Sequence, residues 1–206
     1  MSEIALPYFL ARPETEPPWP GLVVIHEGNG ISPQLLRLCQ RLAGRGYATI
    51  APDLFFRAGG SESADFASLM GALDTERTLA DIASAADELR GMGATSVGVT
   101  GFCMGGLWAY RAAVSTLGFD AAAGFYGAGI SGELGEPGCP TLLFFGGNDE
   151  YIPAGHIDKV VDHHPETVVY PEAGHGFMRD GSSGYDERAA TDAWNRMLAF
   201  FSEHLP

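Results

Sequence analysis

Blocks of apolar and polar residues predict strands and helices in alternation along this chain. Residues 22–26 form a short apolar run between two turn-forming segments, which is typical of a buried strand. Ser32 and Pro33 then provide an N-cap and a first helical residue for apolar positions that recur at helical spacing up to Gly44. The further segments expected to complete the alternation are 47–51, 75–89, 97–100, 103–117, 121–126, 141–145, 152–161, 168–170 and 186–204.

Strands that alternate with helices predict a fold of the α/β class. Such a chain forms a mostly parallel sheet with helices on both faces, and 206 residues suit one domain covering 1–206. Functional sites then gather at the carboxyl ends of the strands. The segment 55–73 has the weakest pattern, and we expect it to be a loop or a short cap helix over one edge.

Composition and charge exclude several classes of function. The net charge of −14 and the absence of a Lys/Arg cluster argue against a nucleic-acid surface. Cys39, Cys103 and Cys139 are widely spaced, which suits a reducing compartment and predicts no metal site. No apolar stretch approaches the roughly 20 residues that span a bilayer. We therefore expect a soluble cytoplasmic protein, a monomer or small homo-oligomer, that binds no membrane.

The sequence "GFCMGG" at 101–106 is the first candidate for chemistry. A G-x-C-x-G pattern between a strand and a helix has the form of a nucleophile elbow, with cysteine where serine is commoner. The glycines relieve crowding at the turn, and the helix N-terminus favours a thiolate at Cys103. The alternative is a small buried cysteine at a glycine-rich junction.

Two further residues complete a possible catalytic triad. Asp149 follows the strand 141–145, and His175 follows the strand 168–170, which is the order nucleophile, acid, base along the chain. Cys103 would be the nucleophile, His175 the general base and Asp149 the acid that orients the imidazole. The alternatives are a turn-forming aspartate and a loop imidazole without a catalytic role.

At this point the sequence resembles the dienelactone hydrolase family of α/β-hydrolases. The resemblance covers most of the chain and rests on "VVIHEGNG", "GYATIAPDLFFR", "VGVTGFCMGG", "AAAGFYGAG", "LLFFGGNDEYIP" and "EAGHGFMRDGSSGYD", which occur in this order. It implies an α/β-hydrolase fold, no cofactor or metal, and a triad of Cys103, Asp149 and His175. It also implies that Glu27 lies near the cysteine and helps to generate the thiolate when substrate binds.

The resemblance implies further binding residues. An elbow supplies the backbone N–H of Met104 as an oxyanion donor, and Gly28 would supply the second. Arg179 matches the family arginine that binds a substrate carboxylate, although it could be a surface arginine. Tyr126 and Tyr185 are candidates for lining the pocket or for packing in the core.

One segment departs from the family. The family has a second arginine, with neighbouring Tyr and Trp, after the motif "PDLFFR", whereas 58–73 contains no Lys, Arg, Tyr or Trp. Arg57 and Arg77 flank this segment without matching that arginine. The apolar residues available to line a cap are Phe66, Leu69 and Met70. A more apolar ester or lactone than dienelactone is therefore the expected small-molecule substrate.

Other interpretations compete with ester hydrolysis through a thioacyl-enzyme. One is a carboxylesterase or thioesterase acting on a more apolar acyl substrate, and another is a non-catalytic ligand-binding member of the fold. The tripeptide His164-Pro165-Glu166 is similar to the H-P-E signature of class I glutamine amidotransferases. A catalytic H-P-E would leave the segments around Asp149 and His175 without a role, so we expect it to end a helix.

Overall fold

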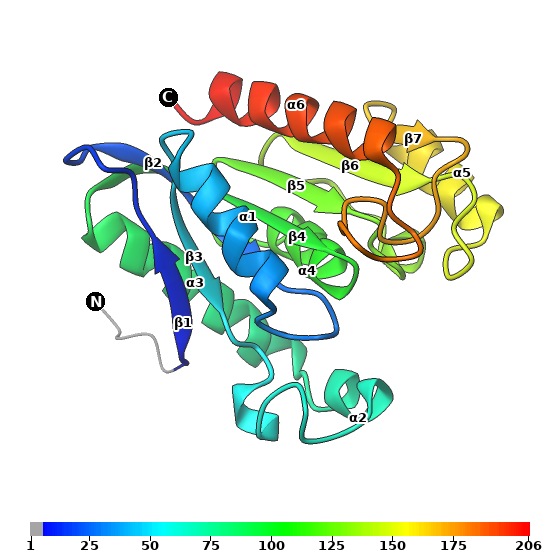
Figure 1. Ribbon diagram of the computed structural model, residues 1–206, viewed down its shortest axis with the longest axis horizontal. Helices are drawn as coiled ribbons and strands as arrows, with labels where there is room; N and C mark the ends of the chain where they lie inside the picture. Colours follow the sequence, from blue (N-terminus) through cyan, green and yellow to red (C-terminus); the bar gives the residue numbers. More distant parts are fainter. Residues whose placement is uncertain (1–5) are drawn as a thin grey trace.

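The computed structural model describes residues 6–206, and one seven-stranded sheet runs through it (Figure 1). The strands are β1 (Tyr8–Ala11), β2 (Trp19–Ile25), β3 (Ala48–Pro52), β4 (Ala94–Phe102), β5 (Ala121–Phe125), β6 (Thr141–Gly146) and β7 (Val168–Tyr170). Their spatial order is β1-β3-β2-β4-β5-β6-β7. β1 is antiparallel to β3, and every other pair is parallel. The prediction of a mostly parallel sheet is confirmed.

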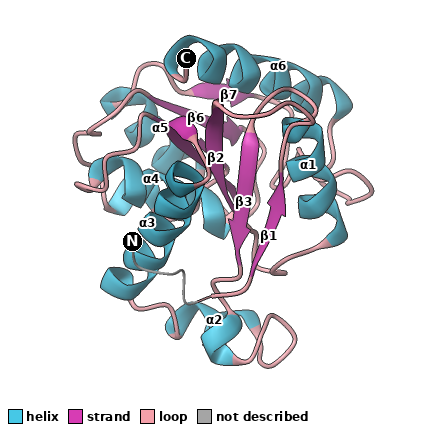
Figure 2. Ribbon diagram, turned by 90° about the vertical axis from the view of Figure 1, so that its left-hand side faces the viewer, coloured by secondary structure: helices cyan, strands magenta, loops and turns pink. Residues whose placement is uncertain are grey.

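Helices cover both faces of this sheet, as predicted (Figure 2). α1 (Pro33–Ala43) and α6 (Glu187–His204) pack on one face, and α3 (Thr75–Gly91) and α4 (Met104–Val114) pack on the other. The remaining helices are α2 (Phe66–Gly71), α5 (Ala154–His163) and the short 3-10 helices η1 (Phe56–Ala58) and η2 (Ile130–Gly132). One buried apolar cluster lies under α1 and α6, and a second lies under α3 and α4. Between residues 6 and 206, no helix is long and apolar enough to cross a membrane.

The helix boundaries follow local capping chemistry. Ser32 caps α1 by accepting a 3.2 Å hydrogen bond from the Leu35 N–H, and Pro33 is the first helical residue, as predicted. α4 ends at Val114, three residues earlier than the predicted 117. Ser115 adopts an extended backbone there, and its hydroxyl donates to the Ala112 carbonyl, so the side chain satisfies one of the helix's last acceptors.

The sequence pattern missed the edge strand β1. It pairs antiparallel with β3, from Tyr8 opposite Pro52 to Ala11 opposite Thr49. Its four residues have one strand neighbour and remain exposed or half-buried. An edge strand of this kind has no fully buried face, and so it lacks the alternation that identifies a strand in a sequence.

The carboxyl ends of the parallel strands carry the predicted site residues. Glu27 follows β2, Cys103 follows β4, Asp149 follows β6, and His175 follows β7. The segment 55–73 forms η1 and α2 near this end of the sheet, which confirms the predicted loop or short cap helix (Figure 1).

Candidate active site

Cys103 lies in a strained turn between β4 and α4. Its backbone has φ 54° and ψ −118°, a conformation that L-residues rarely adopt. A side chain at Gly101 would overlap the Gly105 carbonyl oxygen, and one at Gly105 would overlap the Ile25 carbonyl oxygen. The two glycines of the motif are therefore required for the turn, as the elbow interpretation predicts.

The start of α4 places backbone donors beside the thiol. Met104 is the first residue of α4, so its N–H has no partner within the helix. The Cys103 N–H donates a 3.0 Å hydrogen bond to the Phe125 carbonyl, which anchors the elbow to the neighbouring strand. The positive end of the helix dipole favours a negative charge at this position.

His175 and Asp149 form a buried hydrogen-bonded pair. His175 Nδ1 lies 2.8 Å from Asp149 Oδ2, and the aspartate side chain is fully buried while that of the histidine is 10% exposed. Asp149 Oδ1 accepts hydrogen bonds from the backbone N–H groups of Tyr151 at 2.8 Å and Ile152 at 3.1 Å. The carboxylate is therefore both a turn former and the partner of the imidazole.

The pKa of His175 is raised from its ordinary value to about 9. Burial alone would lower this pKa, but hydrogen bonds with Asp149 and with the Cys103 sulfur outweigh it, because both stabilise the protonated ring. The rings of Tyr126 and Tyr151 meet the imidazole edge-on, with centroids 5.1 and 4.9 Å away. His175 is thus held between an aspartate, a cysteine and two aromatic rings.

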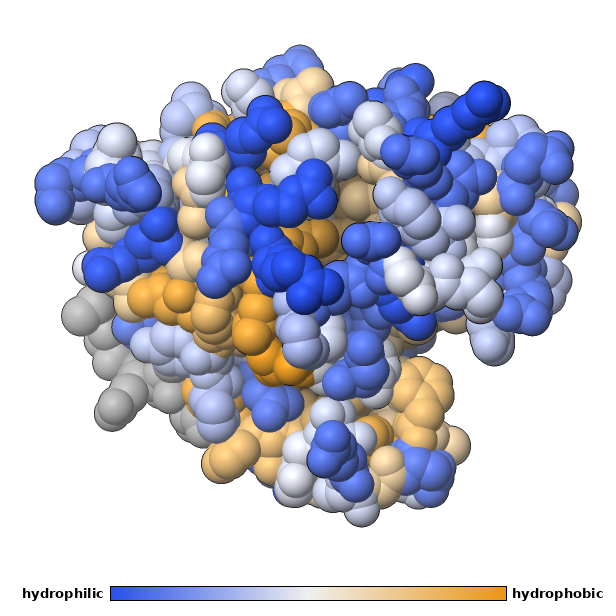
Figure 3. Space-filling model, in the orientation of Figure 1, coloured by the Kyte–Doolittle hydropathy of each residue, from blue (hydrophilic) through white to orange (hydrophobic). Residues whose placement is uncertain are grey.

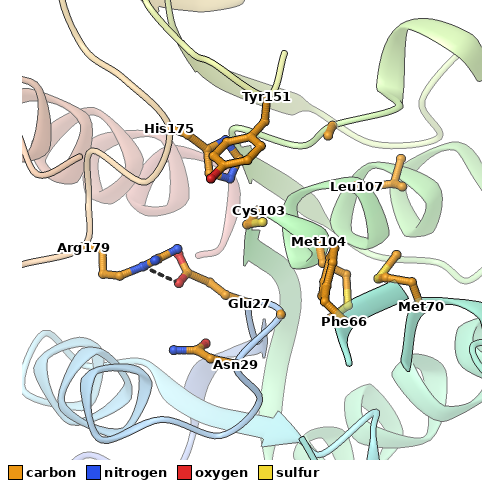
Figure 4. A pocket seen from close by; sticks show the side chains of 12 residues that line it. Glu27, Asn29, Phe66, Met70, Cys103, Met104, Leu107, Tyr151, His175 and Arg179 are labelled. Carbon is orange, nitrogen blue, oxygen red and sulfur yellow. Dashed lines mark ion pairs between the residues drawn. The ribbon is translucent and has the colours of Figure 1, made fainter. Parts of the chain in front are cut away.

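Glu27 and Arg179 form an ion pair at the edge of the site. Arg179 Nε lies 2.7 Å from Glu27 Oε2, and the side chains are 34% and 14% exposed (Figure 4). The hydroxyl of Tyr126 donates to Glu27 Oε1 at 3.1 Å. Burial and the Glu27 carboxylate raise the pKa of Tyr126 well above its usual range, so the phenol remains a donor. Both Glu27 oxygens are therefore engaged, one by Arg179 and one by Tyr126.

One cavity of about 650 Å³ contains the candidate site. Its lining residues are Glu27, Gly28, Asn29, Phe66, Met70, Cys103, Met104, Leu107, Ala128, Tyr151, His175 and Arg179 (Figure 4). The triad candidates Cys103 and His175, both oxyanion candidates and Arg179 thus meet at one place. Asp149 lies behind His175.

The two tyrosines predicted as possible pocket residues lie elsewhere. Tyr126 is fully buried and contacts His175 and Glu27 from behind. Tyr185 is 39% exposed and is not among the residues that line the cavity. Sequence reasoning missed Tyr151, whose ring covers His175, although its position two residues after Asp149 is a signal that could have been used.

Sequence reasoning also missed His26, which ties two loops of the site together. Its Nδ1 lies 2.7 Å from the Glu27 carbonyl, and its Nε2 accepts a 3.1 Å hydrogen bond from the Leu54 N–H. The ring is fully buried, and burial lowers the pKa of His26, so the neutral form with Nδ1 protonated fits both contacts. The loop that carries Glu27 and Gly28 is thereby fastened to the segment that leads into the cap.

His164 takes the structural role expected of it. It is the C-cap residue of α5, and its Nε2 lies 2.8 Å from the hydroxyl of Tyr110. It does not line the cavity that contains Cys103. Within residues 6–206, no group of three or more His, Cys, Asp or Glu side chains is placed to hold a metal ion.

A mostly parallel sheet with a cysteine elbow and a buried Asp-His pair at its carboxyl edge defines an α/β-hydrolase. Residues 6–205 match the model of the dienelactone hydrolase family, and this chain therefore belongs to that family and is a carboxylic ester hydrolase.

Individual relatives agree with this assignment. The chain is 31% identical to the carboxymethylenebutenolidase of Pseudomonas putida, over 90% of this chain and 86% of that protein. It is 32% identical to a Yersinia pestis protein named as a candidate carboxymethylenebutenolidase, over 97% and 84% of the two chains. The crystal structure of a candidate dienelactone hydrolase from Klebsiella pneumoniae superposes with a TM-score of 0.86 at 31% identity, covering 96% of this chain and 93% of that one.

Proposed function

We propose that this protein hydrolyses an ester or lactone through Cys103, His175 and Asp149, with a thioacyl-enzyme intermediate. The observation that carries the proposal is that Cys103 and the hydrogen-bonded pair of His175 and Asp149 meet at one cavity, where Cys103 and Asp149 together raise the pKa of His175. The raised pKa of His175 supports a protonated imidazole that can donate its proton to the leaving group.

In the first half of the reaction, the Cys103 thiolate attacks the carbonyl carbon and forms a C–S bond. The carbonyl electrons move to oxygen, and the N–H groups of Gly28 and Met104 stabilise the oxyanion. The tetrahedral intermediate then breaks its C–O bond, and the leaving alkoxide takes the proton from His175. The products of this half are an alcohol, or the tethered alcohol of an opened lactone, and a thioester on Cys103.

In the second half, His175 acts as the general base. Once Cys103 is acylated its negative charge is gone, so the pKa of His175 falls and the neutral imidazole can accept a proton from water. The resulting hydroxide attacks the thioester, and the C–S bond breaks to return the thiolate. His175 is again protonated, and the carboxylic acid leaves.

Glu27 prepares the nucleophile in this proposal. It lines the same cavity as Cys103, but both of its oxygens are bound by other side chains in this structure. A substrate that enters beside this ion pair and displaces the Glu27 side chain by contact frees the carboxylate, which can then accept the proton of the Cys103 thiol. This role follows the family resemblance and is supported by the ion pair.

The decisive test combines kinetics with trapping of the intermediate. We expect 4-nitrophenyl butyrate to be hydrolysed, and mass spectrometry of the quenched enzyme to place a butyryl group on Cys103. Cys103→Ala should abolish turnover and the adduct, while Cys139→Ala, at a half-buried cysteine outside the cavity, should keep both. Turnover by a folded Cys103→Ala variant would overturn the mechanism.

Assays with a wider set of substrates distinguish the other two interpretations, a non-catalytic binding protein and a thioesterase. A non-catalytic binding protein would give neither adduct nor turnover with any short ester or lactone. A thioesterase would prefer the butyryl thioester of N-acetylcysteamine over the oxygen ester of the same acyl group.

A further inference from the structure

The cap places an aromatic ring against the loop that carries the proposed oxyanion donor. A Cβ atom on Gly28 would lie 2.5 Å from Cε2 and 2.7 Å from Cδ2 of Phe66, so the ring occupies the space of a side chain at that position. Phe66 is nevertheless 51% exposed. One edge of the ring covers Gly28, and much of the rest is free to contact a ligand.

Three more apolar side chains complete this side of the cavity. Met70 lies one turn after Phe66 on α2, while Met104 and Leu107 face it from α4 (Figure 4). We call these four residues the apolar wall. On the face drawn in Figure 3, apolar surface also gathers over the cap at the lower end of the molecule. Cys103 lies at the end of the wall, so a substrate held by its carbonyl there would place an attached group against these side chains.

Positive charge is scarce in the same cavity. Among the lining residues Arg179 carries the one permanent cation, and its guanidinium is paired with Glu27. Arg57, which lies in η1 before α2, binds Asp81 with Nη2 2.9 Å from Oδ1, and both line a separate hollow. A carboxylate on the substrate would therefore have to displace Glu27, in a chain whose net charge is −14.

We propose that the substrate is an uncharged ester or lactone whose alkyl or aryl group packs on the apolar wall, and that Phe66 selects it. This inference rests on the proposed ester hydrolysis and adds the substrate class to it. Each methylene group buried against the wall is expected to improve kcat/KM about fourfold. The improvement in kcat/KM is smaller when the group that meets the wall is charged, because the apolar wall offers that charge no hydrogen-bond or ion-pair partner.

The test uses two esters with the same leaving group and the same two-methylene spacer in the acyl chain. In 4-nitrophenyl butyrate the acyl chain ends in a methyl group, and in 4-nitrophenyl hemisuccinate it ends in a carboxylate. We expect the unmodified protein to prefer the butyrate by about tenfold or more in kcat/KM. Phe66→Ala should reduce kcat/KM for the butyrate about tenfold, mainly through KM, and change the hemisuccinate value less than about twofold. Phe56→Ala is the matched control, because Phe56 is 49% exposed and does not line the cavity.

A second variant tests the contact between Gly28 and the ring. Gly28→Ala keeps the backbone N–H, and its Cβ should push the half-exposed Phe66 ring outward rather than unfold the chain. We expect it to reduce the preference for butyrate as Phe66→Ala does, and the double variant should show no further loss of preference. Additive losses in the double variant would show that the ring does not act through its place on Gly28.

The outcomes distinguish the two proposals. Equal or faster hydrolysis of the hemisuccinate by the unmodified protein, or an unchanged preference in Phe66→Ala, overturns the substrate class. If Cys103→Ala is inactive in that case, the proposed mechanism stands. A protein that hydrolyses neither ester, or a Cys103→Ala variant that hydrolyses both, overturns the proposed function and this inference with it.

Discussion

Asp149→Asn isolates the electrostatic part of the proposed triad. The amide keeps Oδ1 as acceptor for the backbone N–H groups of Tyr151 and Ile152, so the turn should be preserved. At Oδ2, 2.8 Å from His175 Nδ1, the negative charge is replaced by a neutral NH2 group. The variant therefore changes the charge and tautomer of His175 with little change in shape.

The magnitude follows from the raised pKa of His175. A rise from 6.5 to about 9 corresponds to about 3 kcal/mol in favour of the imidazolium. Because the carboxylate is fully buried, we expect its removal to lower the pKa of His175 by about one to three pH units. The amide also donates a hydrogen bond to Nδ1 of His175, so the ring carries its proton on Nε2. A protonated Nε2 cannot accept a proton from water. We therefore expect kcat/KM to fall about 10²- to 10⁴-fold.

Two measurements check this prediction. NMR titration of the His175 ring should show the lower pKa. The pH profile of 4-nitrophenyl butyrate hydrolysis should show its decline, which we expect near pH 9 in the unmodified protein, shifted to lower pH by a similar amount. Asp158→Asn, at an exposed position on α5, is the control. An unchanged His175 pKa in Asp149→Asn, or a loss of kcat/KM below about tenfold, would refute the reasoning.

The same pKa predicts how stability depends on pH. His175 has a higher pKa in the folded protein than in the unfolded chain, so its stabilising contribution is complete below about pH 6.5 and is lost as the pH rises through about 9. The free energy of unfolding, measured in urea, should therefore decrease less between pH 6 and pH 10 for Asp149→Asn than for the unmodified protein. An identical loss in the two proteins would argue against the shifted pKa.

Two further predictions concern the elbow and the ion pair. Gly101→Ala should lower the free energy of unfolding by about 3 kcal/mol or more in urea titrations, because its Cβ would overlap a carbonyl oxygen. Gly155→Ala in α5 is the control: its Cβ would meet open space, so the variant should be neutral or stabilising. Equal effects of the two substitutions would contradict the need for glycine at position 101. Glu27→Gln should preserve folding, since the amide oxygen can still accept a hydrogen bond from Tyr126. It should lower kcat/KM at least about tenfold, because the amide cannot accept a proton from Cys103. A fully active variant would remove Glu27 from the mechanism.

Much of the fold could be predicted because its signals are local. The N-cap at Ser32, the proline after it and the apolar runs of the central strands depend on neighbouring residues, and the structure places the corresponding elements within a few residues. The strand 168–170 has the predicted bounds, whereas β1 was missed because its residues are exposed or half-buried at the sheet edge and carry no alternation of buried and exposed positions.

The candidate site could be predicted in part for the same reason. The elbow motif required Gly101 and Gly105 at fixed spacing, and the structure shows their side-chain space occupied by carbonyl groups. The cap was harder. Phe66 and Met70 line the cavity, but Leu69, which the sequence offered equally, is buried in the core. Which side of the six-residue helix α2 faces the cavity depends on how the helix packs against the rest of the protein. A segment this short carries no apolar periodicity that would predict that side.

The elbow also limits which amino acids could ever replace the one at position 103. At φ 54° a residue branched at Cβ is strongly disfavoured, so threonine is a poor replacement although it carries the same hydroxyl as serine. Serine and cysteine both fit, because their reactive Oγ or Sγ atom is the only heavy atom attached to Cβ. The φ angle at position 103 thus restricts the nucleophile, in natural or engineered variants, to residues that are unbranched at Cβ.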